Sequence, residues 1–147
     1  MALLELFNLL HFIGIAFGLG GATIATIISA KAEKDKEIGA VIMKIMPSIA
    51  KIIWLGMVFL LISGVGLIFF VKWPLNKQIL IIKHVLVAWI IIIGITMGTR
   101  MKKMSLLAPK PKEKPSIQFL NLKKQMKFLS ILNLILWYLV TILSVFV

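Results

Sequence analysis

The sequence predicts an all-α, polytopic membrane protein whose four transmembrane helices form an up-down bundle. Composition is the first reason, because 61% of the 147 residues are hydrophobic and the mean hydropathy is +1.05, well above a soluble domain. The second reason is a set of four apolar runs, each close to the ~20 residues that a helix needs to cross a bilayer. The third is that basic residues gather between these runs instead of along them. The runs are residues 6–30, 52–71, 78–99 and 128–147.

We expect residues 1–147 to form a single domain, and the first two spans are its first half. The residues before the first span include Glu5 and no basic residue, whereas a signal peptide begins with basic residues. The apolar stretch of this span is also far longer than the core of a signal peptide, so we interpret the span as a transmembrane helix. Residues 38–50 are mildly apolar and are expected at the interface, with Pro47 where the second helix begins or bends. The expected spans are about 4–30, 50–72, 78–100 and 125–147.

The last two spans are separated by the clearest break in the chain. Lys83 is the only charged residue within the third apolar run. Beyond that run, Pro109, Pro111 and Pro115 alternate with lysines, and this pattern excludes a continuous helix. We therefore expect an exposed loop at residues 109–115, in addition to turns at 31–37 and 73–76.

Charge predicts the orientation of the bundle. Fourteen of the seventeen basic residues lie in the connections after the first and third spans, and the other side holds only Lys72, Lys77 and Lys83. By the positive-inside rule the two basic connections face the cytoplasm, so both termini face outward in a multi-pass protein of the cell membrane. The net charge of +12 then acts mainly in insertion and in attraction to anionic lipid. Because the basic residues flank spans and lack interleaved aromatics, no nucleic-acid partner is expected.

The first span is rich in small residues. Gly14 and Gly18 form a GxxxG motif with Ala22 four residues further on, and Gly94 and Gly98 repeat the spacing in the third span. Such motifs allow two helix backbones to approach closely. One interpretation is plain helix contact, and the other is that the glycines leave room for a flat prosthetic group.

Each of the two histidines lies on a defined face of an apolar span. At ~100° per residue, His11 shares a stripe with Gly18, and His84 shares one with Gly98. Both histidines are expected roughly 9–10 Å inside the outer boundary, counting ~1.5 Å per residue. In an up-down ring the first and third helices are diagonal neighbours, so their axes are about 11–14 Å apart. The imidazoles would then leave space between them for something thin.

The second and fourth spans bring a suitable lining to this depth. It consists of Ser63, Gly64, Gly66, Trp137, Tyr138 and Thr141. Two imidazoles with flat glycine surfaces and aromatic rings favour b-type haem, whereas two histidines alone do not complete a tetrahedral metal site. Alternatively, each histidine only donates a hydrogen bond across helices or lies near the interface. The candidate cofactor-binding residues are His11, Gly14, Gly18, Gly64, Lys83, His84 and Tyr138, with the two histidines as metal ligands.

Short motifs in all four spans point to a family. They are Leu10-His11-Phe12-Ile13-Gly14 with Gly18-Leu19-Gly20-Gly21, Ile82-Lys83-His84-Val85-Leu86 with Gly94 and Arg100, Met46-Pro47-Ser48 before Trp54-Leu55-Gly56, and Leu132-Asn133. In these motifs and in length the chain resembles the CopD-like membrane proteins, a superfamily that includes the HemJ-type protoporphyrinogen oxidases. The resemblance implies a haem b or copper-linked role, with His11 as the matched ligand and Lys83 as the matched intramembrane lysine. Where the family has acidic and proline residues after its last-helix asparagine, this chain has Leu134 and Ile135, so protoporphyrinogen oxidation is implied less than haem binding.

Other polar and soft groups have two interpretations each. Lys83 either snorkels outward along its four-carbon stem or lies near His84, where it would meet a haem propionate or an acidic substrate group. Glu5 either pairs with Lys83 or stays in water, and Asn133 is expected to bond across helices. Methionines suit Cu(I), but these form no ladder through the membrane and are interpreted mainly as packing residues. Those at the cytoplasmic side are Met43, Met46, Met101, Met104 and Met126.

The leading hypothesis is a small membrane protein that binds b-type haem between the first and third spans near the outer face and transfers electrons. Its partners would be the lipid bilayer and a quinone or a redox protein. The second hypothesis is CopD-like copper transport or resistance, and the third is a structural or accessory subunit of a homo-oligomer or membrane complex. The sequence contains no serine–histidine–acid set, intramembrane carboxylate pair or phosphate loop. If the protein is an enzyme, its cofactor performs the chemistry.

Overall fold

The computed structural model describes residues 2–32, 36–70, 76–109 and 114–146, and its regular elements within these ranges are all helical. The first span is built from three consecutive helical segments, and one of them is a π-helical turn. The other three spans are uninterrupted α-helices. The elements are α1 (Ala2–Ile15), η1 (Ala16–Gly20), α2 (Gly21–Ala32), α3 (Lys36–Phe70), α4 (Lys77–Leu106) and α5 (Ile117–Leu143).

Four helical segments are long and apolar enough to cross a membrane, so the chain is a multi-pass membrane protein. Many of their large apolar side chains are exposed, as expected where lipid and not water surrounds the bundle. The predicted fold class, an all-α bundle of four membrane-spanning helices, is confirmed. The segments are Ala2–Ala32, Val41–Phe70, Lys77–Leu106 and Ile117–Leu143.

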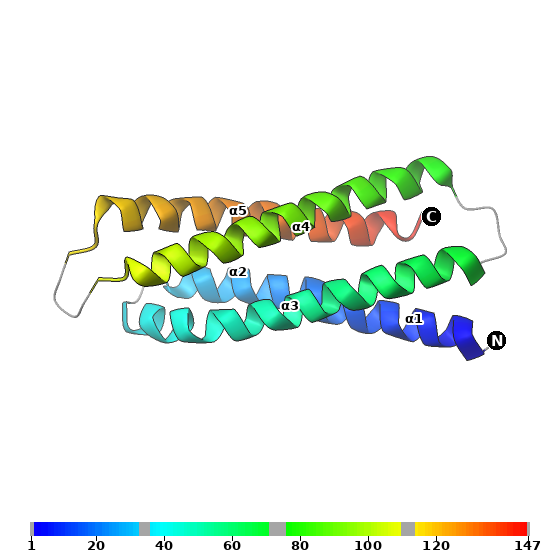
Figure 1. Ribbon diagram of the computed structural model, residues 1–147, viewed down its shortest axis with the longest axis horizontal. Coiled ribbons are helices and arrows are strands. Elements are labelled where there is room, and N and C mark those ends of the chain that lie inside the picture. The colour runs from blue at the N-terminus through cyan, green and yellow to red at the C-terminus, as the bar shows by residue number, and fades with distance from the viewer. Residues whose placement is uncertain (1, 33–35, 71–75, 110–113, 147) are drawn as a thin grey trace.

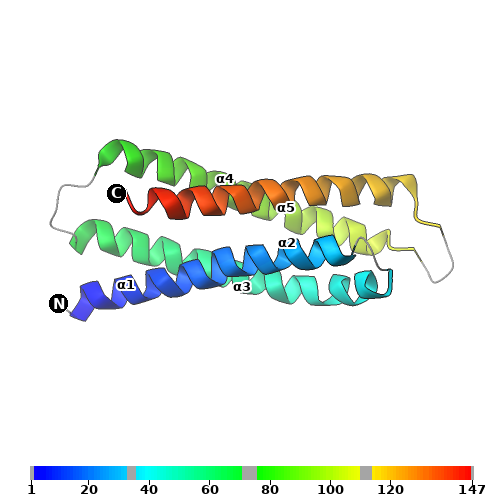
Figure 2. The ribbon, with the colours of Figure 1, turned by 180° about the vertical axis from the view of Figure 1, so that it is seen from behind.

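The helices alternate in direction, so that the start of α1 and the end of α5 lie at the same end of the bundle (Figure 1). Two antiparallel pairs are present, α1 with α3 and α4 with α5. The view from behind shows α2 between α3 and α5 (Figure 2), and α2 packs against both. The first span therefore joins the two helix pairs into one bundle.

Glycines make the first span and α3 approach closely. A Cβ atom built on Gly56 would lie 2.5 Å from the backbone nitrogen of Gly18, and one built on Gly14 would lie 3.0 Å from the carbonyl oxygen of Gly56. Because both obstacles are backbone atoms that a side-chain rotation cannot move, only glycine fits at Gly56. The GxxxG motif of the first span is thus part of a helix crossing.

The core lies at mid-depth, where the two helix pairs meet. Trp137 of α5 is 2% exposed, and its ring lies so close to Gly18 that an added Cβ there would be 2.3 Å from the ring. A side chain at Gly18 would therefore displace the largest buried residue. The buried core cluster is Ala22, Met57, Ile90, Trp137 and Val140.

Helix starts agree with the capping chemistry of the sequence, with one exception. Asn76 begins α4 by accepting a hydrogen bond from the amide of Ile79 at 3.3 Å, and Ser116 begins α5 by accepting one from Phe119 at 3.2 Å. Pro47, which we expected where the second helix begins or bends, lies well inside α3, so the helix begins before it. A proline deprives one carbonyl of its usual donor, and α3 nevertheless continues through it to Phe70. The predicted turns at 31–37 and 73–76 and the loop at 109–115 lie partly outside the described residues.

Candidate functional site

The most distinctive polar contact inside the bundle joins His11 of α1 to Ser63 of α3. The distance from Nδ1 of His11 to Oγ of Ser63 is 3.0 Å, and Ser63 is 0% exposed. The Ser63 hydroxyl also donates to the carbonyl oxygen of Leu60 at 3.3 Å. Since a hydroxyl has one proton, Ser63 must accept from His11, so Nδ1 carries the imidazole proton. Nε2 of His11 therefore keeps its lone pair.

Packing on both sides fixes the register of this contact. One turn toward the end of the bundle that carries the termini, the ring of Phe7 covers Gly66, where an added Cβ would meet it at 2.5 Å. Phe7 also stacks on Phe70, with ring centroids 5.6 Å apart. One turn in the other direction, Gly14 lies against Leu60. His11 is consequently held between two tight helix contacts that admit no shift of one residue.

Lys83 of α4 is half-buried and comes one residue before the exposed His84. The two interpretations that we gave for Lys83, snorkelling outward or a position near His84, stay predictions. Glu5 is exposed and forms no ion pair among the described residues.

His84 lies on a different side of α4 from Lys83. Consecutive helical residues point ~100° apart, and here Lys83 is half-buried whereas His84 is exposed. Nδ1 of His84 donates to the carbonyl oxygen of Leu80 at 2.7 Å, so in the neutral ring the lone pair is on Nε2. Both histidines thus present Nε2 as the available ligand atom, but His11 faces α3 and His84 faces outward.

The predicted flat surfaces differ in what covers them. Gly14 and Gly18 lie against protein, namely the backbone and Leu60 of α3 and the ring of Trp137, whereas a Cβ on Gly64 would meet nothing within 4 Å. Tyr138 is 45% exposed, and its hydroxyl is 3.5 Å from Oγ1 of Thr23. Because Thr23 is ~18 Å along the helix from His11 at ~1.5 Å per residue, Tyr138 contributes to another level of the bundle.

Two buried polar atoms on α5 have no hydrogen-bond partner among the described residues, Oδ1 of Asn133 and Nε1 of Trp137. They belong to residues one helical turn apart, so an acceptor and a donor lie on the same face at mid-membrane. The expected bond from Asn133 across helices is not formed by its side-chain oxygen. An asparagine in an otherwise apolar span indicates a buried polar side chain, but the sequence pattern does not show which group would be its hydrogen-bond partner.

The methionines at the end of the bundle opposite the termini are half-buried on three different helices, and Met57 is part of the apolar core. Among the described residues, no group of three or more histidine or acidic side chains is placed to hold a metal ion.

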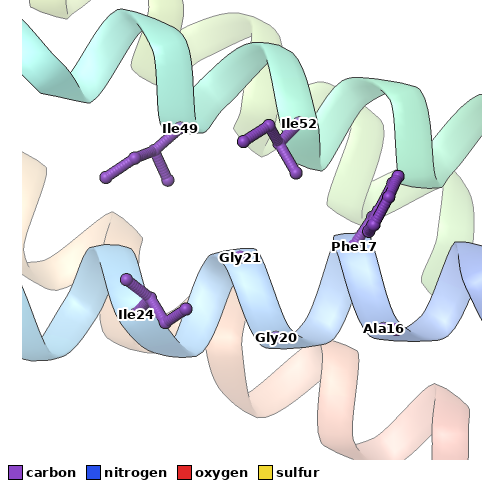
Figure 3. Close-up of a pocket in the computed structure, with 7 residues that line it drawn as sticks. All are labelled: Ala16, Phe17, Gly20, Gly21, Ile24, Ile49 and Ile52. Atoms are coloured by element: carbon purple, nitrogen blue, oxygen red, sulfur yellow. The ribbon is translucent and has the colours of Figure 1, made fainter.

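A small groove lies between the first span and α3, on the outside of the bundle. It has a volume of about 220 Å³, and its lining is entirely apolar. Ile24 of α2 and Ile49 and Ile52 of α3 point into the space between the two helices (Figure 3). Such a surface offers contact to an acyl chain and no chemical group to a reaction.

Comparison with family models, curated proteins and solved structures finds no match to this chain. The class of this protein is therefore defined by its fold and by its candidate site. It is a four-helix, multi-pass membrane protein in which a histidine of the first span bonds a buried serine of α3.

Proposed function

We propose that the protein binds b-type haem in the outer half of the bundle and takes part in electron transfer at the cell membrane. The observation that carries the proposal is the hydrogen bond from His11 to the buried Ser63. In metal-binding histidines, a bond from one ring nitrogen fixes the tautomer and the ring orientation while the other nitrogen binds the metal. Nε2 of His11 is the ligand atom that this arrangement leaves.

His84 is the second proposed ligand, because its Nδ1 is also engaged and its Nε2 also keeps a lone pair. The two imidazoles are the same chemical donor, and together they suit iron better than a bare ion that needs four ligands. Since His84 is exposed, the number of histidines on the iron is the point that an experiment must decide.

Lys83 has a separate role in the proposal. Its side chain is half-buried on α4, and in the proposal its ammonium pairs with a haem carboxylate. The iron supplies one-electron chemistry when haem is bound, and the protein supplies the ligand, the charge and the apolar surroundings. A quinone or a redox protein at the outer face would be the electron partner.

The test is an absorption spectrum of the detergent-purified protein from haem-replete cells. We expect the sharp bands of reduced b-type haem, and we expect His11→Ala to abolish them. Loss of His84 in His84→Ala should convert a six-coordinate spectrum into a five-coordinate one if His84 is the second ligand. Thr96→Ala is the control, because its hydroxyl bonds only a carbonyl of its own helix, that of Ile92.

A protein that is colourless from such cells and takes up no added haemin would overturn the proposal. Copper retained under the same conditions would favour the CopD-like alternative. A stoichiometric protein partner that co-purifies with the colourless protein would favour an accessory subunit.

A further inference from the structure

A second hollow lies at the end of the bundle opposite the termini, between α4 and α5. It has a volume of about 510 Å³ and is open to the outside. Two of its side chains are cationic, one is an amide and two are apolar. The lining residues are Arg100, Lys124, Gln125, Phe128 and Leu129.

The cationic part of this hollow is built across two helices. Nη1 of Arg100 on α4 donates to Oε1 of Gln125 on α5, which orients the guanidinium toward the seam between the helices. That bond uses one of the five N–H donors of an arginine, and a phosphate can engage others in a bidentate manner. Lys124 is exposed on the turn that carries Gln125, so a second positive charge stands beside the first.

The apolar part lies one turn deeper. Phe128 follows Lys124 by four residues and therefore lies on the same face of α5, and it is 67% exposed. Leu129 is related to Gln125 in the same way. The hollow thus crosses the boundary between the charged end of the bundle and its apolar span. Its cationic side chains lie nearer the end of the bundle, and its apolar side chains lie nearer the middle.

No acidic side chain of these two helices compensates the charge. The acidic residues of the chain are Glu5, Glu33, Asp35, Glu37 and Glu113, so neither α4 nor α5 contains one. A free phosphate would use only the cationic part of the hollow. A phospholipid would use both parts, since its headgroup and acyl chains have the same order of charge and hydrocarbon.

We infer that this hollow binds an anionic phospholipid, with the lipid phosphate on Arg100 and Lys124 and an acyl chain along Phe128 and Leu129. Basic pockets between transmembrane helices on the cytoplasmic side are suited to anionic headgroups, and the charge distribution of this chain predicts that side for this end. The lipid would hold α4 and α5 together at the end where Arg100 and Gln125 already join them. This inference is independent of haem binding.

The test is native mass spectrometry of the detergent-purified protein with added phosphatidylglycerol or phosphatidylcholine of identical acyl chains. Phosphatidylglycerol should bind at least tenfold more tightly. The double variant Arg100→Gln/Lys124→Gln should weaken phosphatidylglycerol binding ~10- to 30-fold, from the loss of two charges near the headgroup. Arg100→Lys, which keeps the charge and loses the bidentate geometry, should give an intermediate loss.

The matched control is Lys44→Gln/Lys51→Gln, which removes two exposed charges from the half of α3 that begins at Lys36. It should change binding less than twofold. An equal loss in this control would mean general charge attraction and would overturn the inference, as would equal binding of the two lipids. Displacement of the lipid by millimolar inorganic phosphate would show a phosphate site instead. Circular dichroism of each variant checks that the helices are retained. A further variant, Phe128→Ser, should weaken lipid binding although the charge of the protein is unchanged.

Discussion

His11 donates a hydrogen bond to the hydroxyl of Ser63 across 3.0 Å, from one membrane-spanning helix to the next. The hydroxyl is fully buried and itself donates a hydrogen bond to the carbonyl of Leu60. The contact therefore couples three groups in surroundings where little water can replace a lost partner. It gives the α1–α3 pair a polar link in addition to its glycine packing.

Ser63→Ala should destabilise the bundle by about 1–2 kcal/mol, because it leaves the Nδ1 proton of His11 without its acceptor. A double-mutant cycle with His11→Ala should give a coupling energy of about 0.6–1.7 kcal/mol. Unfolding in mixed micelles of increasing denaturing detergent measures both quantities. Additive effects of the two substitutions would show that the bond contributes nothing to stability.

Gly56→Ala should destabilise the bundle by about 1–3 kcal/mol, the usual cost of overpacking. Its Cβ would lie 2.5 Å from the backbone nitrogen of Gly18, so the two helices would have to separate. Gly64→Ala on the same helix is the control, since its Cβ would meet nothing within 4 Å. Removing a helical glycine there should stabilise the protein by roughly 0.5–1 kcal/mol. The same unfolding assay compares them, and a similar loss at both positions contradicts the packing account.

The fold could be predicted from the sequence because a membrane-spanning helix needs a long apolar run, and the chain has four. The inward face of the first span could also be predicted. Its small residues mark the side of close contact, and His11 shares a stripe with Gly18, which is buried. Helix caps such as Asn76 carry a local signal too.

The rotation of α4 could not be predicted in the same way. In a bilayer the lipid-facing and bundle-facing sides of a helix are equally apolar, so hydropathy does not say which side faces inward. Lys83 and His84 are neighbours in the sequence and point ~100° apart, and the stripe of His84 runs mostly along the exposed side of α4. Only the packing of Ile90 and Ile93, both buried, shows that Lys83 faces inward.

The orientation of the bundle in the membrane is a separate prediction. A reporter fused after the last residue should be outside the cell, and one inserted after Lys114 should be cytoplasmic, because fourteen of the seventeen basic residues lie in the connections at that end. Paired reporters that are active on opposite sides, such as a phosphatase and a fluorescent protein, measure this. Because the start of α1 and the end of α5 lie at the same end of the bundle (Figure 1), finding the two termini on opposite sides would contradict the structure, and finding both inside would contradict only the charge rule.

The last prediction concerns the charge of Lys83 and follows from the proposed haem site. Lys83→Met should lower the reduction potential of the bound haem by on the order of 40–90 mV, the size of a charge interaction of ~1–2 kcal/mol in a partly buried site. The sign follows because the reduced iron centre carries one positive charge less, so a nearby ammonium stabilises the reduced form and raises the potential. The coordination spectrum should stay unchanged, since Lys83 is not proposed as a ligand. Potentiometric titration of the purified protein measures the shift. Lys83→Arg is the matched control, because it retains the positive charge and should hold the potential near that of the native protein. A potential that falls equally in both variants would mean that Lys83 acts through packing rather than charge.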